Sequence, residues 1–197
     1  MKISPRISYS FIEPIKRHRG FICLILILVC ICIFCAILAG IKFSNSTLII
    51  SFSNVTVVKF LRGSSGLGGM IFTSIFSISI FCAIIMLSCY KKYTISIGIF
   101  FYCYYVYVQT LVLIAFILEY GIINTLAISF CILIFMCITI FLMLHLFLIC
   151  LECQTSYQYF KTSLVNCIPI LIFIAAVIVT QSLIFFVLKN YVIILVY

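Results

Sequence analysis

The sequence has few of the side chains that enzymes use for acid–base or metal chemistry. Charged residues make up 8% of the 197 residues, and the only acidic ones are Glu13, Glu119 and Glu152. The only histidines are His18 and His145. General acid–base catalysis and metal catalysis need such groups to converge in one protected site. No His-Glu-x-x-His helix and no Gly-x-Ser-x-Gly elbow occurs, so we expect no enzymatic activity.

The sequence is rich in long apolar runs, unlike the mixed sequence of a soluble protein. Hydrophobic residues make up 67% of the chain and the mean hydropathy is +1.46, which leaves no room for a soluble domain of ordinary size. A helix needs roughly 20 apolar residues to cross a hydrocarbon core about 30 Å thick. Five runs reach that length without an internal Lys, Arg, Asp or Glu: 21–41, 70–89, 95–118, 122–150 and 164–188. We therefore predict an all-α fold, a polytopic integral membrane helix bundle with about five transmembrane helices.

The remaining residues suggest a simple domain organisation. Residues 1–20 form a basic cytoplasmic segment, and residues 21–197 form one membrane domain. The connection 42–69 has apolar residues at helical spacing, which is typical of an amphipathic element on the outer surface, although its β-branched residues also permit a strand. The tail 189–197 either continues the last helix or folds back along the interface.

The distribution of Lys and Arg predicts the orientation. Cytoplasmic loops near a membrane are enriched in these residues. Eight of the twelve fall on the side of the N-terminus and four on the opposite side. This asymmetry predicts a multi-pass protein of the cell membrane with a cytoplasmic N-terminus and an extracytoplasmic C-terminus. Because the basic residues flank membrane runs, we assign the net charge of +9 to contact with the lipid bilayer and expect no nucleic-acid partner.

A basic cluster precedes the first apolar run and is a candidate membrane-surface anchor. Its cations are Lys16, Arg17 and Arg19, and Phe11 and Ile15 lie close before them. Such a segment can lie flat on an anionic surface. An ordinary positive-inside flank explains the same residues equally well.

Twelve cysteines are present, and most lie inside apolar runs. The segment Cys30–Cys35 and the pair Cys150 and Cys153 have the Cys-x-x-Cys spacing that can hold zinc or a redox disulfide. Neither has a complete set of ligands nearby, so we expect no metal and no cofactor, and interpret the thiols as packing groups of the core. Cys150 and Cys153, near the cytoplasmic surface, are also candidates for reversible acylation.

Gln109 lies near the middle of the third run and is a candidate polar site within the membrane. An amide in hydrocarbon requires a partner, so it should face another helix. Tyr102 and Tyr105 precede it by seven and four residues and share its helical face. Together they could line a polar path or recognise a ligand, or they could form hydrogen bonds between packed helices.

His145 and Glu152 are seven residues apart and share a face of the fourth run. A proton relay would use such a pair, but a relay needs ionisable groups continued across the membrane. Since both lie near the cytoplasmic end, we expect them to be solvated at the surface.

Short motifs stand at the ends of the closely spaced runs: Ala39–Gly40, Lys91–Lys92, Ile97–Gly98 and Glu119–Tyr120–Gly121. In these motifs and in the order of its elements, the chain resembles the stage II sporulation protein M family of Firmicutes. The resemblance implies a non-enzymatic membrane protein that assembles with partners. In sporulating cells it would recruit peptidoglycan-degrading enzymes during engulfment.

Two functions are compatible with these features. The first is a scaffold or subunit of a membrane complex that binds other membrane proteins, in sporulation or cell-envelope remodelling. The second is a membrane component of a small-solute transporter with a polar path near Gln109, Tyr102 and Tyr105. Neither the partner nor the oligomeric state follows from the sequence.

Overall fold

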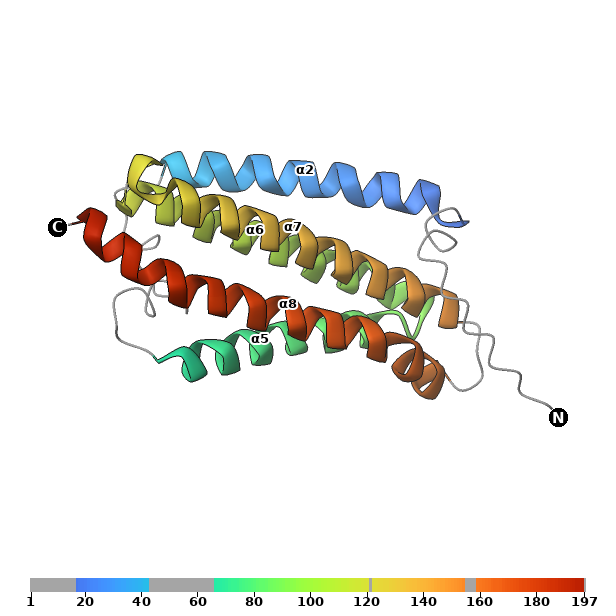
Figure 1. Cartoon of the computed structure of the whole chain (residues 1–197). Helices are drawn as coiled ribbons and strands as arrows, with labels where there is room; N and C mark the ends of the chain where they lie inside the picture. Colours follow the sequence, from blue (N-terminus) through green and yellow to red (C-terminus); the bar gives the residue numbers. More distant parts are fainter. Residues whose placement is uncertain (1–16, 43–65, 121, 155–158, 197) are drawn as a thin grey trace.

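The computed structural model describes residues 17–42, 66–120, 122–154 and 159–196. Within these ranges the chain is helical and has no strand, which confirms the predicted all-α fold. Its helices are α2 (Arg19–Lys42), α5 (Leu67–Ser88), the short 3-10 helix η1 (Lys92–Thr94), α6 (Ile95–Tyr120), α7 (Ile122–Cys153) and α8 (Tyr159–Val196) (Figure 1). The predicted outer loop 42–69 falls largely outside the described residues.

The five long helices correspond to the five predicted apolar runs. They contain 22 to 38 residues, and at 1.5 Å per residue they measure about 33 to 57 Å. Each is long and apolar enough to cross a membrane, so the protein is a multi-pass membrane protein. The last helix continues past the predicted limit at residue 188 as far as Val196, and it contains Pro169, which cannot donate a backbone hydrogen bond.

Successive helices run in opposite directions. In Figure 1, α2, α6 and α8 begin at the end of the bundle where α5 and α7 finish. The pair α6 and α7 occupies the middle, with α2 on one side and α5 and α8 on the other. The start of α2 and the last residues of α8 therefore lie at opposite ends of the bundle.

A tight turn joins α5 to α6, and the Thr94 side chain bridges it. The Thr94 hydroxyl donates to the Ser88 carbonyl at 2.6 Å and to the Lys91 carbonyl at 2.8 Å. The bond to Ser88 gives a partner to a carbonyl in the last turn of α5, which the helix itself leaves unpaired. The turn is short enough to hold the two helices as antiparallel neighbours.

The core is densest around the second half of α7. Residues 145–150 are all buried there, and the Phe147 ring stacks on Phe21 of α2 with 5.5 Å between ring centroids. Gly98 of α6 lies in the same region. A Cβ built on Gly98 would meet the Ser88 side chain and would approach the Phe147 Cε2 atom to 2.7 Å. A glycine at this position therefore lets α5, α6 and α7 approach one another closely.

Candidate functional site

The two tyrosines of the predicted polar site lie in the packed core. Tyr102 is 2% exposed, and its hydroxyl donates to the Ile140 carbonyl of α7 at 3.1 Å. Tyr105 is also buried, with its ring edge-on to Phe81 of α5 at 5.1 Å. Gln109 is half-buried on α6. Tyr102 thus contacts α7 through a hydrogen bond, and Tyr105 contacts α5 through its ring.

Removing the Tyr102 hydroxyl should weaken the bundle without unfolding it. We expect a Tyr102→Phe variant to lose about 0.6 kcal/mol, the average for a hydrogen bond between transmembrane helices. Thermal denaturation in mild detergent measures the loss. Tyr104→Phe is the matched control, because Tyr104 lies on the exposed side of α6. Equal stability of Tyr102→Phe and the wild type would show that the bond to Ile140 does not contribute.

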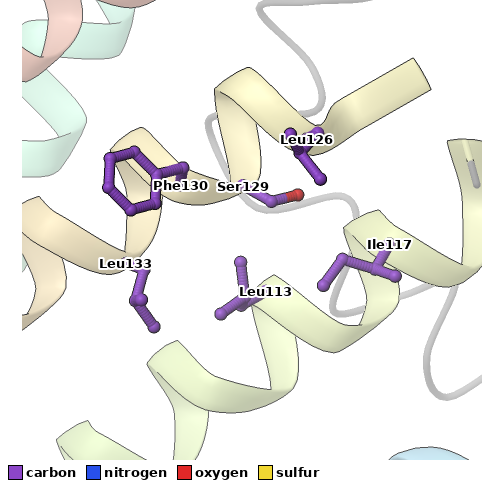
Figure 2. Close-up of a pocket in the computed structure, with 6 residues that line it drawn as sticks. All are labelled: Leu113, Ile117, Leu126, Ser129, Phe130 and Leu133. Carbon is purple, nitrogen blue, oxygen red and sulfur yellow. The ribbon is translucent and has the colours of Figure 1, made fainter. Parts of the chain in front are cut away.

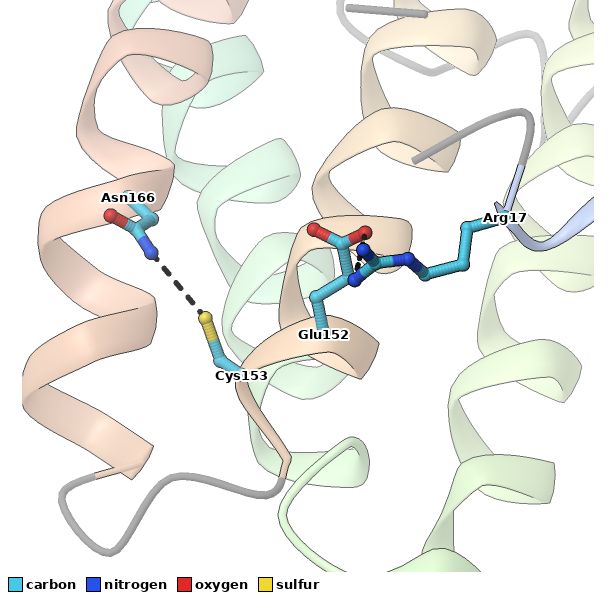
Figure 3. Close-up of polar contacts among 4 residues, drawn as sticks. All are labelled: Arg17, Glu152, Cys153 and Asn166. Carbon is cyan, nitrogen blue, oxygen red and sulfur yellow. Dashed lines mark hydrogen bonds and ion pairs between the residues drawn. The ribbon is translucent and has the colours of Figure 1, made fainter. Parts of the chain in front are cut away.

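The described part of the basic cluster lies at the start of α2. Arg17 and Arg19 are exposed, and Lys16 lies outside the described residues. Figure 3 shows the Arg17 guanidinium reaching the Glu152 carboxylate at the end of α7, with 3.8 Å between nitrogen and oxygen. The Arg17 side chain is 67% exposed, so solvent screens the pair and its contribution to stability is small. Its position still links the start of α2 to the end of α7.

Most of the described cations gather at one end of the bundle. We call this the basic end, and it comprises Arg17, Arg19, Lys91, Lys92 and Lys161. The Lys91 ammonium also lies 5.6 Å from the centre of the Tyr93 ring. Aromatic and basic side chains of this kind are typical of the boundary between lipid and water. At the opposite end, Lys42 is the last residue of α2.

His145 is not at the surface, and the expectation that it is solvated there was wrong. Its side chain is 3% exposed within α7. The reason is that α7 is the central helix, so packing against its neighbours encloses the turn that carries His145. Glu152 lies two turns further on and reaches the surface, where it meets Arg17. The two residues therefore occupy different environments.

Buried thiols form a cluster between α5, α7 and α8. The Cys150 and Cys167 sulfurs are 3.7 Å apart, and the Asn166 amide lies 3.5 Å from the Cys153 sulfur (Figure 3). Cys89 is buried beside the same core. Among the residues that the structure describes, no group of three or more His, Cys, Asp or Glu side chains is arranged to hold a metal ion.

The exposure of the cysteines contradicts two expectations. Cys150 and Cys153 are buried, so neither thiol can be reached for acylation at the surface. Cys30 and Cys35 are exposed on α2 and do not fill the core as expected. The exposed face of α2 is as apolar as its packed face, so the sequence carries no signal that distinguishes the two.

An apolar pocket opens between α6 and α7 near the turn that joins them. Its volume is about 300 Å³. Figure 2 shows side chains of α6 facing those of α7 across it, and the lining consists of Leu113, Ile117, Leu126, Ser129, Phe130 and Leu133. Among the lining residues that the structure describes, Ser129 alone has a polar side chain. Sequence analysis did not identify this site, because nothing in these residues sets them apart from the rest of two apolar runs.

Comparison with protein-family models, curated proteins and solved structures gives no match. The resemblance to the stage II sporulation protein M family stays a prediction from sequence.

Proposed function

We propose that this protein is a non-enzymatic scaffold or subunit of a membrane complex. The observation that carries the proposal is that the central helices are packed on most sides, whereas the outer helices are largely exposed. Tyr102 and Tyr105 pack between helices. By contrast, only 11% of the spanning part of α2 and 22% of that of α5 are buried, against 56% for α7. The outer helices therefore have broad faces on which other membrane proteins can pack.

The outer face of α5 supports an association of this kind. Gly69, Thr73 and Ser77 follow one another at intervals of four residues, and all three are exposed. Small residues at this spacing allow a second transmembrane helix to approach the backbone closely. The rings of Phe72 and Phe76 stack beside them and form a ridge along the same side of the helix. We call this surface the α5 small-residue face.

Enlarging a side chain on this face tests the proposal. Affinity purification in mild detergent should recover the wild-type chain with a membrane-protein partner, and we expect Gly69→Leu to reduce that recovery at least tenfold. A Cβ on Gly69 meets nothing within 4 Å, so the variant should fold normally. Ala176→Leu, at an exposed small residue of α8, is the matched control.

Two outcomes of this purification would count against the proposal. A wild-type chain recovered only as a monomer, with no protein partner, would argue against a scaffold. Recovery of a partner by Gly69→Leu at the wild-type level would show that the partner does not use the α5 small-residue face. Denaturation of the purified variant at the wild-type temperature excludes a folding defect as the cause of any loss.

We further propose that the basic end faces the cytoplasm. The cations Arg17, Arg19, Lys91, Lys92 and Lys161 support this orientation, because Lys and Arg are enriched in short cytoplasmic loops. The opposite end, with the end of α8, would then be extracytoplasmic. If the resemblance to the sporulation family holds, the partners include enzymes that degrade peptidoglycan, and these should co-purify with the chain from sporulating cells.

A further inference from the structure

The turn between α5 and α6 carries two adjacent lysines on a backbone that is held in place. Lys91 and Lys92 are both exposed. The Thr94 hydroxyl bridges the turn by its bonds to the Ser88 and Lys91 carbonyls, and the Thr94 backbone N–H donates to the Lys91 carbonyl at 3.1 Å. The two ammonium groups therefore extend from a short, hydrogen-bonded turn and not from a long loop.

Two tyrosines beside these lysines are suited to the level of lipid headgroups. The Lys91 ammonium lies 6.0 Å from the centre of the Tyr90 ring and 5.6 Å from that of the Tyr93 ring, which is within the range of a cation–π contact. Both rings are exposed. Tyrosine is enriched at the boundary between lipid and water, where its ring meets hydrocarbon and its hydroxyl meets headgroups.

Negative charge that could balance the two lysines is scarce. Among the side chains that the structure describes, Glu152 is the only acidic one, and its ion pair is with Arg17. An anionic group from outside the chain would therefore complement Lys91 and Lys92.

The depth of the turn indicates where that anionic group comes from. Helix α5 has 22 residues and is about 33 Å long, close to the thickness of a hydrocarbon core of about 30 Å. Lys91 and Lys92 follow the end of α5 at Ser88 by three and four residues. The lysines thus lie just outside the hydrocarbon, at the level of the lipid phosphates.

An exposed apolar stripe continues from the turn into the membrane. It consists of Ile97, Phe100 and Tyr104 of α6, which are all exposed and share one helical face. The rings of Phe100 and Tyr104 stack with 6.5 Å between their centroids. The stripe is about 10 Å long, which fits within one leaflet of a core about 30 Å thick. One acyl chain can lie along it.

We propose that the α5–α6 turn binds one anionic phospholipid. Its phosphate lies against the Lys91 and Lys92 ammonium groups, and one of its acyl chains follows the stripe from Ile97 to Tyr104. A free phosphate would meet the same lysines but would leave the stripe unused. The site depends neither on the proposed scaffold function nor on which side of the membrane the basic end faces.

Native mass spectrometry of the purified chain with defined lipids tests the site. The probes are phosphatidylglycerol, which is anionic, and phosphatidylcholine, which has no net charge. The wild type should retain phosphatidylglycerol about 30-fold more strongly, as expected for two lysines beside an anionic group. The double variant Lys91→Gln/Lys92→Gln should lose this preference. The matched control Arg19→Gln/Lys161→Gln removes the same charge from exposed residues of the same end and should keep it.

Photocrosslinking tests the position of the acyl chain. Phosphatidylglycerol with a diazirine in its acyl chain should label the α6 peptide that contains Phe100, and Lys91→Gln/Lys92→Gln should lose this label. An excess of glycerol phosphate, which has the phosphate but no acyl chain, should not displace the lipid.

Several results would overturn the proposal. Equal retention of the two lipids by the wild type would show that the turn does not select an anionic headgroup. Equal losses in the two double variants would show that the charge of the basic end acts as a whole and not through one site. Displacement by glycerol phosphate would identify a site for a free phosphate. If the lysine variant keeps the lipid but loses the membrane-protein partner in affinity purification, the turn binds a protein instead.

Discussion

A Gly98→Val variant is expected to lose about 3 kcal/mol of stability, the upper end of the usual cost of overpacking. Even the first added carbon would overlap the Ser88 side chain and come within 2.7 Å of Phe147 Cε2. Because these neighbours are buried side chains of α5 and α7, they must shift, or a helix must move away from α6, to admit the added carbons. The midpoint of thermal denaturation in mild detergent measures the loss.

Two further variants separate the clash from the effect of valine in a helix. Gly20→Val introduces the same side chain at an α2 position where nothing lies within 4 Å, so its stability should stay near that of the wild type. Ser88→Gly in the Gly98→Val background should recover part of the loss, because it removes one of the two groups in conflict. If Gly98→Val is as stable as Gly20→Val, the close approach of α5, α6 and α7 is wrong.

Truncation of Phe147 should be comparably destabilising. Phe147 is fully buried and its ring stacks on Phe21, so Phe147→Ala would leave a cavity where α2, α6 and α7 meet. In soluble cores this change costs about 3 to 5 kcal/mol. We expect the lower value of about 3 kcal/mol, because lipid tails solvate separated helices and the loss comes mainly from packing. Thermal denaturation in the same detergent is again the measurement.

The control for this variant comes from the same helix. Phe141 is 50% exposed, so Phe141→Ala should have little effect. In addition, the double variant with Gly98→Val should lose less stability than the two single variants together, because removing the ring makes room for the valine. Additive losses would mean that Gly98 and Phe147 are not in contact.

The fold followed from the sequence because run length alone decides whether a helix can cross a bilayer. The runs 21–41 and 122–150 needed no further information to be read as helices, since backbone groups in hydrocarbon must be satisfied within the segment. The sequence left open whether the tail 189–197 continues the last helix, and the structure shows that α8 continues through Lys189 and Asn190 to Val196.

The side chains that face inward could not be predicted in the same way. Helices such as α2 are apolar on every side, so no polar face sets their rotation, as it would in a soluble protein. For this reason Cys30 was assigned to the core although it is exposed, and His145 was assigned to the surface although it is buried. Gly98, a glycine within an apolar run, does lie where helices pack closely.

The central claim is that five helices cross the membrane in alternating directions, and reporter fusions at the helix ends test it most directly. The fusion sites follow Lys42, Ser88, Tyr120, Cys153 and Val196. The account predicts that reporters after Ser88 and Cys153 lie on one side of the membrane, and that the other three lie on the opposite side. Reporters on the same side after any two consecutive helices would contradict the five-helix bundle.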